Sequence, residues 1–214
     1  MNCLVVAATP IEITPFLDYF KSSNIKNIDV LITGIGLTAT TYSLMRQLRL
    51  KKPDFIIQAG VCGCFDTSIP LGKTVVVKQE AIADQSVIEL NKLKTLVDLK
   101  LVPQNQFPYK KGWLINNSEM LKKTTLKKVK GISVNEITTS RQKIKFYTET
   151  FNPVVESMEG AALHYVCLME KIPFIQLRTV SNYMAERNKK KWNMKESIII
   201  LNNELIKLLN NCNF

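Results

Sequence analysis

The sequence predicts a single-domain α/β fold in which a central mixed β-sheet is flanked by helices. Short apolar stretches rich in β-branched residues alternate with longer amphipathic stretches along the chain, as strands and helices do in such folds. The apolar stretches are nearly continuous, which indicates strands that are buried on both faces. The 214 residues contain no repeat, low-complexity segment or linker, so we expect one domain over residues 1–214.

The first part of the chain contains three predicted strands and two predicted helices. The strands are Cys3–Ala8, Asp29–Thr33 and Phe55–Ala59, and the helices are Pro10–Phe20 and Leu37–Leu50. Thr9-Pro10-Ile11-Glu12 reads as a capping box with proline at the first helical position. The first helix is therefore expected to begin directly after the first strand.

The rest of the chain continues the alternation. Predicted strands cover Lys73–Val77, Trp113–Ile115, Ile132–Ile137 and Phe174–Val180, and predicted helices cover Ser118–Lys128, Ser140–Thr148, Ala161–Glu170 and Lys195–Leu209. The stretch Ser86–Pro108 is harder to interpret, and we assign it as helix plus loop.

The cysteines predict reduced thiols and no structural metal. The five cysteines form an odd set that is scattered over the chain: Cys3, Cys62, Cys64, Cys167 and Cys212. Cys62 and Cys64 are two residues apart, but neither a second cysteine pair nor more than one histidine exists to complete a zinc site.

The formal charge of +11 is compatible with a nucleic-acid partner, but the pattern of lysines does not favour one. The lysines are dispersed and are not interleaved with aromatic residues of the kind that stack on bases. We therefore favour a solvated lysine-rich surface over nucleic-acid binding. A basic, non-catalytic protein that associates with nucleic acid remains the alternative from another functional class, and binding to heparin would distinguish it.

The sequence predicts neither a membrane partner nor export. No apolar run approaches the roughly 18 residues that a membrane-spanning helix needs. The first residues lack a basic segment, and Glu12 falls where a signal peptide would still be apolar. A cytoplasmic location is the expectation.

Ligands in open α/β sheets bind at the carboxyl ends of the strands, and four polar or glycine-rich segments follow predicted strands here. They are Thr9–Glu12, Gly34–Gly36, Gly60–Gly63 and Arg178–Asn182, and the pair Met158-Glu159 at the start of a helix joins them. We expect these segments to meet at one edge of the sheet.

The segment Gly34-x-Gly36-x-x-Ala39 superficially matches a dinucleotide fingerprint. It follows the second strand rather than the first, and the next strand does not end in an acid. A nicotinamide or flavin site is therefore not expected. The glycines let backbone approach a ligand or simply make a tight turn, and the sequence does not decide between these interpretations.

Several candidate residues also have structural interpretations. Glu12 and Glu159 sit at helix starts, where a carboxylate compensates the helix dipole. Arg178 is less easily explained in this way, because a guanidinium in a buried strand must meet a carboxylate or an anion. His164, the only histidine, is flanked by apolar residues and is expected in the core or an interface.

Taken together, the motifs resemble the nucleoside phosphorylase and nucleosidase superfamily over nearly the entire chain. The specific segments are Met158-Glu159-Gly160-Ala161-Ala162 and Arg178-Thr179-Val180-Ser181-Asn182, which follow Glu12, Gly34-Ile35-Gly36 and Ala59-Gly60-Val61-Cys62-Gly63 in the family's order. The resemblance implies a nucleoside phosphorylase-like fold, no cofactor and a purine nucleoside as the substrate. It also implies a homodimer or a higher homo-oligomer.

The resemblance is to the hydrolytic branch of that superfamily. Phosphorylases carry a phosphate-binding motif after the first strand, whereas this chain has Glu12, whose carboxylate repels phosphate but can deprotonate water. At Asn182 the chain departs from the adenosine-type nucleosidases, which have Asp, and offers two N–H donors that suit a 6-oxopurine. With Ser181-Asn182-Tyr183 and Arg187-x-x-x-x-Trp192, this is similar to futalosine hydrolases of the menaquinone pathway.

The resemblance also implies the role of each candidate residue. Glu12 is the general base, Asn182 stabilises the leaving base, and Arg178 holds Glu12 ionised and orients the water. The residues implied in substrate binding are Gly60, Val61, Ile137, Met158 and Glu159, with Glu159 on the ribose hydroxyls. Val61 replaces a serine that is common in nucleosidases, and the local match around Ile137 and Thr138 is poor. An adenosine-type nucleosidase and a phosphorylase remain alternatives.

Overall fold

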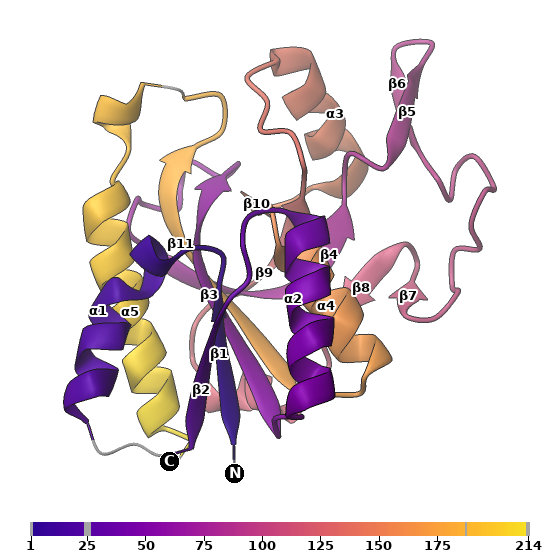
Figure 1. Ribbon diagram of the computed structural model, residues 1–214. Coiled ribbons are helices and arrows are strands. Elements are labelled where there is room, and N and C mark those ends of the chain that lie inside the picture. Colours follow the sequence, from indigo (N-terminus) through magenta and orange to yellow (C-terminus); the bar gives the residue numbers. More distant parts are fainter. Residues whose placement is uncertain (1, 24–26, 187, 213–214) are drawn as a thin grey trace.

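The computed structural model describes residues 2–23, 27–186 and 188–212 (Figure 1). The strands are β1 (Cys3–Ala7), β2 (Ile28–Ile32), β3 (Phe55–Cys64), β4 (Thr74–Ile82), β5 (Ser86–Glu89), β6 (Lys92–Thr95), β7 (Tyr109–Lys110), β8 (Trp113–Ile115), β9 (Lys128–Ser133), β10 (Val155–Ser157) and β11 (Phe174–Tyr183). The helices are α1 (Pro10–Ser22), α2 (Leu37–Leu50), α3 (Arg141–Phe151), α4 (Gly160–Met169) and α5 (Met194–Asn210), with 3₁₀ turns at Glu119–Lys123 and Lys189–Lys191.

The main sheet is mixed, as predicted. Its strand order is β2-β1-β3-β10-β9-β4-β8-β7, and β11 pairs with both β3 and β4. β1 is parallel to β2 and β3, whereas β10 runs antiparallel to β3 and β11 runs antiparallel to β4. Because β11 bridges β3 and β4, the strands β3, β10, β9, β4 and β11 form a closed ring.

Helices cover both faces of the open part of the sheet, with α1 and α5 on one side and α2 and α4 on the other (Figure 1). Val5 of β1 packs in the cluster that contains α1 and α5, whereas its neighbours Leu4 and Val6 pack against α2 and α4. Successive residues of a strand point to opposite faces, so a strand buried on both sides must be apolar throughout. This explains the continuous apolar runs in the sequence.

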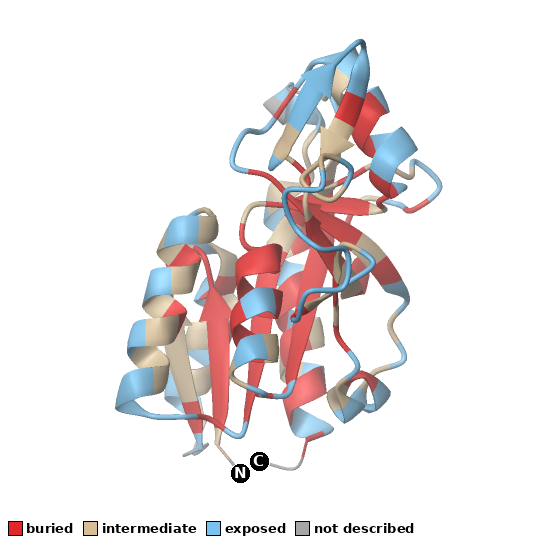
Figure 2. Ribbon diagram, turned by 90° about the vertical axis from the view of Figure 1, so that its right-hand side faces the viewer, coloured by how far each residue is buried: buried red, intermediate tan, exposed pale blue. Residues whose placement is uncertain are grey.

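The stretch Ser86–Pro108 does not form the predicted helix. It begins with the antiparallel hairpin of β5 and β6, which is largely exposed (Figure 2), and continues as turns. Leu90 and Asn91, at the tip, have φ values of 48° and 60°. Positive φ at both central residues gives the twist that a two-residue hairpin loop needs, but Leu is not a typical residue for that turn. The sequence therefore indicates a hairpin turn at this position only weakly.

Further boundaries differ from the prediction: β3 continues to Cys64, so Gly60–Gly63 lies inside this strand rather than after it. Ser118 caps a helix as expected, accepting a 3.1 Å hydrogen bond from the Met120 N–H, but the helix is a 3₁₀ turn that ends at Lys123. The chain then pairs with β4 from Lys128 onward, so tertiary pairing ends the helix early. The strand predicted over Ile132–Ile137 is β9, which begins at Lys128 and ends at Ser133. Ile137 therefore lies in the loop that follows β9.

His164 has no exposed surface and packs edge-on against Phe174, which confirms the predicted core position. All five cysteines are buried and unpaired. Within the described residues, no helix is long and apolar enough to cross a membrane.

Candidate functional site

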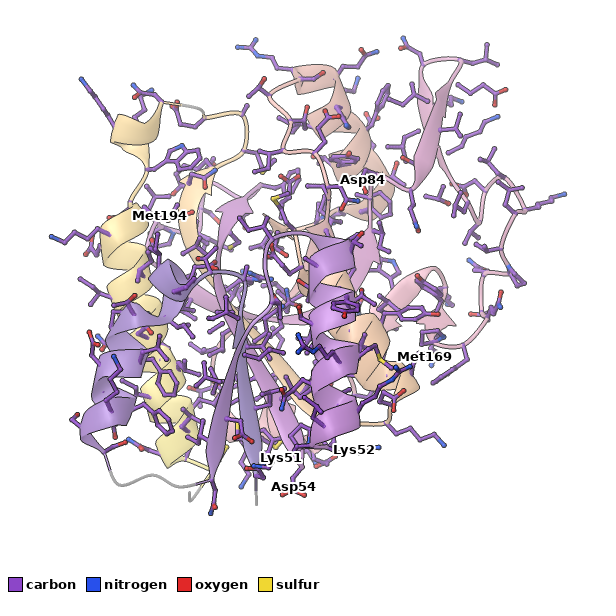
Figure 3. All side chains as sticks on the ribbon, in the orientation of Figure 1. Lys51, Lys52, Asp54, Asp84, Met169 and Met194 are labelled. Atoms are coloured by element: carbon purple, nitrogen blue, oxygen red, sulfur yellow. The ribbon has the colours of Figure 1, made fainter. Side chains whose placement is uncertain are left out.

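A cavity of about 460 Å³ opens at the carboxyl ends of the central strands. Met194, which lines it, lies in the same half of the molecule as Asp84, and Lys51, Lys52 and Asp54 mark the opposite end of the sheet (Figure 3). Segments far apart in sequence supply its wall: Ala8, Thr9, Ile11, Glu12, Ile35, Val61, Cys62, Gly63, Ile137, Thr138, Glu156, Ser157, Met158, Glu159, Ser181, Asn182, Met184, Ala185, Glu186, Trp192, Met194 and Ile198.

Arg178, on β11, lies beneath this cavity and is only 1% exposed. Its Nη2 donates to Gln58 Oε1 at 3.0 Å and to Glu159 Oε2 at 3.4 Å. The predicted carboxylate partner of Arg178 is therefore Glu159. A side chain at Gly60 would not fit, because its Cβ would lie 2.2 Å from Nη1 of Arg178.

The carboxylate of Glu12 links the start of α1 to β3. Its Oε2 accepts hydrogen bonds of 3.1 Å from the N–H and the hydroxyl of Thr9, which is the predicted capping contact. Its Oε1 accepts a 3.2 Å bond from the backbone N–H of Val61. Glu12 thus caps the helix and lines the cavity at once, and Val61 contributes through its backbone.

Arg178 favours the ionised form of Glu12, as expected of a nearby positive charge, but burial opposes this effect. The positive charge of Arg178 and the Val61 hydrogen bond do lower the pKa of Glu12, but burial raises that pKa by more. Removal of water disfavours the charged carboxylate, so its net pKa lies above the ordinary glutamate value. A carboxylate with a raised pKa is also a stronger base once it is ionised.

Glu159 precedes α4 and is 5% exposed. Besides its contact with Arg178, its Oε1 accepts a 3.2 Å hydrogen bond from the N–H of Gly36, whose φ is 91°. The Gly34–Gly36 turn therefore brings backbone close to this carboxylate. Met158 is partly buried and lines the cavity beside it.

Asn182 lies just after an irregularity in the pairing of β11 with β3. Its Oδ1 accepts a 2.9 Å bond from the Ser181 hydroxyl, and its Nδ2 donates to Tyr183 O at 3.2 Å. One amide hydrogen is thus engaged by backbone, so only the other is free to meet a ligand in this conformation. Ser181, which the sequence placed only in the motif, fixes the orientation of the amide.

The remaining predicted positions are at the edge of the cavity or beyond it. Ile137 lines the cavity and is 51% exposed, whereas Thr138 beside it is 6% exposed. Arg187 lies outside the described residues, so of the Arg187–Trp192 pair only Trp192 is placed, and its Nε1 donates to Glu186 O at 2.9 Å.

Sequence reasoning missed two features of the wall. One is Glu156, which stood in the motif without an assigned role; the other is the apolar wall formed by Ile11, Ile35, Met194 and Ile198. The apolar residues carry no local signal, because an exposed position on a helix start or a turn looks the same whether a cavity follows or not.

The charge of the wall is acidic. Four glutamates line the cavity, namely Glu12, Glu156, Glu159 and Glu186, and among the described lining residues there is no lysine or arginine. Such a wall offers acceptors to hydroxyl and N–H groups of a neutral ligand and, among the described lining residues, no cation that would pair with phosphate. Among the described residues, no group of three or more His, Cys, Asp or Glu could hold a metal ion.

Comparisons with known proteins all point to the same protein family. A family model described as the phosphorylase superfamily matches residues 17–211. A 5′-methylthioadenosine/S-adenosylhomocysteine nucleosidase from Buchnera aphidicola subsp. Acyrthosiphon pisum is 26% identical over 204 residues, covering 91% of this chain and 82% of that protein. A futalosine hydrolase from Thermus thermophilus is 25% identical over 182 residues, covering 84% and 80% of the two chains.

Solved structures agree on the fold. Native futalosine hydrolase from Helicobacter pylori superimposes with a TM-score of 0.80 at 17% identity, covering 98% of this chain and 97% of that one. The methylthioadenosine/S-adenosylhomocysteine nucleosidase of the same organism, with butyl-thio-DADMe-Immucillin-A, also gives 0.80, at 18% identity and 98% coverage of both chains. At these identities the match shows a common fold and does not separate the two activities.

Proposed function

The chain belongs to the phosphorylase superfamily, and we propose that it hydrolyses the N-glycosidic bond of a purine nucleoside. The relatives that the chain matches include a nucleosidase and a futalosine hydrolase. The proposed substrate is futalosine, which would yield hypoxanthine and dehypoxanthine futalosine for menaquinone biosynthesis. The observation that carries the hydrolytic reaction is the Glu12 carboxylate, held in an acidic cavity at the carboxyl end of β1.

The acidic wall supports water rather than phosphate as the second reactant. A phosphorylase must hold an anion next to the sugar, and the described wall offers carboxylates instead of cations there. Glu12 in its ionised form can accept a proton from water, and its raised pKa improves that capacity near neutral pH. The proposed reaction therefore uses only protein side chains and water.

In the proposed mechanism, water attacks the anomeric carbon of an oxocarbenium-like sugar while Glu12 takes its proton. The base leaves with the electron pair of the N-glycosidic bond, Asn182 donates a hydrogen bond to it, and it takes a proton from solvent to give neutral hypoxanthine, while Glu12 returns its proton to solvent. Glu159 binds the ribose hydroxyls, and bonds that strengthen in the transition state accelerate the reaction. Arg178 is the buried positive charge that pairs with Glu159 and holds it in place. Gly60, Val61, Met158 and Ile137 shape the substrate cavity.

The choice of futalosine over a methylthioadenosine-type substrate depends on Asn182. The Ser181 hydroxyl donates to Oδ1 and Tyr183 O accepts one amide hydrogen, so one N–H of Asn182 remains for the N7–O6 edge of the base. O6 of a 6-oxopurine can accept that hydrogen, whereas the amino group of adenine would meet it with a donor. The methylthioadenosine/S-adenosylhomocysteine type remains the second candidate, because relatives and structures of both kinds match the chain.

We first predict that base release does not require phosphate. Purified protein incubated with futalosine, inosine, adenosine and methylthioadenosine should release free base and free sugar at the same rate with and without phosphate. Chromatography of the products is the measurement. Formation of a sugar 1-phosphate, or release that depends on phosphate, would contradict the hydrolytic assignment.

Glu12→Gln should lower turnover by about two to four orders of magnitude, because it removes the general base while keeping the shape of the side chain. In the wild type, activity should fall as the pH drops through the raised pKa of Glu12, since protonation removes the base. Glu196→Gln is a matched control, because Glu196 also lies in the first turn of a helix but outside the cavity. If Glu12→Gln changed only thermal stability, Glu12 would be a cap and no more.

We also propose that the chain forms a homodimer or a higher homo-oligomer. Five apolar side chains of the hairpin and the following segment are 46–87% exposed, and they provide a surface that a second copy can cover: Val87, Ile88, Leu90, Leu101 and Phe107. Analytical ultracentrifugation should show a dimer or a larger species at assay concentrations. A fully active monomer would rule this out.

Asn182 should set a preference for 6-oxopurines. An unmade buried hydrogen bond costs about 1–3 kcal/mol, so kcat/KM should favour futalosine over its 6-amino analogue by roughly ten- to hundredfold. Asn182→Asp should shrink or reverse that ratio, because a carboxylate accepts from the amino group. Asn188→Asp, at an exposed position outside the cavity wall, should leave the ratio unchanged. A wild-type preference for the amino base would remove the main support for futalosine.

A further inference from the structure

Glu156, on β10, is a buried acid of the cavity wall whose carboxylate is incompletely paired. The residue is 6% exposed, it lines the cavity, and its Oε2 has no hydrogen-bond partner among the described residues. Two other acids of the wall differ, because Glu12, which is partly buried, is held by Thr9 and Val61, and Glu159, which is buried, by Gly36 and Arg178. Glu156 therefore has a buried acceptor that its protein neighbours leave unpaired, on a side chain that reaches the cavity wall.

The sheet places Glu156 and Asn182 on either side of the same glycine. Gly63 of β3 pairs with Glu156 of β10 and with Asn182 of β11. Paired residues of neighbouring strands project to the same face, and two strand spacings separate their backbones by about 10 Å. A Cβ at Gly63 would lie 3.0 Å from Sδ of Met184 and in ordinary contact, at 3.5 Å, with Nδ2 of Asn182, so a larger residue here would press on the Met184 side chain.

The neighbours of Glu156 do not satisfy its free oxygen. Tyr147 of α3 is fully buried and its hydroxyl is unpaired, as is Oδ1 of Asp84, whose other oxygen accepts from the Asn135 N–H. Lys143 of α3 pairs with Glu136 at 3.1 Å. Lys143, Asp84 and Tyr147 are close enough to interact electrostatically with Glu156. None of them donates a hydrogen bond to its Oε2.

We propose that Glu156 is a specificity-determining residue that binds the six-membered ring of the purine, accepting a hydrogen bond from N1–H of a 6-oxopurine. The proposal rests on the proposed nucleoside hydrolysis. With N7 facing Asn182, N1 lies on the next edge of the ring, beyond C6, and the strand order β10-β3-β11 allows that edge to meet Glu156. Adenine has an acceptor at N1, so an ionised Glu156 would face it with unpaired acceptors.

The proton affinity of Glu156 makes this recognition depend on pH. Burial raises the pKa of Glu156 to about 7, while Lys143 lowers it and Asp84 raises it further. Above that pKa the carboxylate accepts from the N1–H of hypoxanthine. Below it the protonated acid can donate to N1 of adenine. The ratio of kcat/KM for a 6-oxopurine nucleoside over its 6-amino analogue should therefore rise with pH through about 7.

The test measures this ratio from pH 5.5 to 8.5 for the wild type, Glu156→Gln and Glu149→Gln. Glutamine can donate or accept but does not titrate, so Glu156→Gln should lose the pH dependence and lower the ratio at pH 8 about tenfold. Glu149, on the same helix as Lys143 but 61% exposed in its side chain, is the matched control and should behave as the wild type.

The outcomes separate this proposal from the proposed function. A pH-independent ratio in the wild type, or a Glu156→Gln ratio equal to that of the wild type, would overturn the role of Glu156 while hydrolysis itself stands. If no nucleoside is hydrolysed, the proposed function fails, and calorimetric binding of hypoxanthine and adenine at pH 6 and 8 still tests Glu156. Equal changes in the affinity for both bases with pH would then refute it. The wild-type measurements need no variant to fold.

Discussion

A buried guanidinium organises the centre of this molecule. Arg178 lies on β11 with almost no exposed surface, and a buried charge is tolerated only when hydrogen bonds and an opposite charge compensate it. Glu159 supplies the charge and Gln58 a neutral acceptor. Gly60 leaves the volume that the guanidinium occupies. The position of Glu159 at the start of α4, and hence the floor of the cavity, follows from this requirement.

The acids of the cavity wall show how different hydrogen-bond partners give similar side chains different roles. Glu12 and Glu156 are both desolvated, and burial raises the pKa of each despite a nearby cation. Glu12 is restrained by Thr9 and Val61, whereas Glu156 keeps an unpaired oxygen. We therefore assign a proton-accepting role to the restrained acid and a recognition role to the free one.

A single local structure performs two tasks at the start of α1. The helix needs an acceptor for its first N–H groups, and the cavity needs a carboxylate at the end of β1. Glu12 meets both needs, because one oxygen caps the helix while the other faces β3. A structural role and a functional role are thus compatible here, and a change of charge at this position tests them separately.

The sequence by itself determined the α/β class, the residues of most strands and helices, the cap at Thr9 and the need of Arg178 for a counter-charge. These follow from patterns within about ten residues or from the cost of burying one group. Tertiary structure alone decided the ring closed by β11, the early end of the Ser118 helix and the engagement of one Asn182 hydrogen by Tyr183. It also decided that burial outweighs Arg178 at Glu12, and that Gly63 separates Glu156 from Asn182. Strand pairing and desolvation depend on segments far apart in the chain, and no local pattern records which of them will meet.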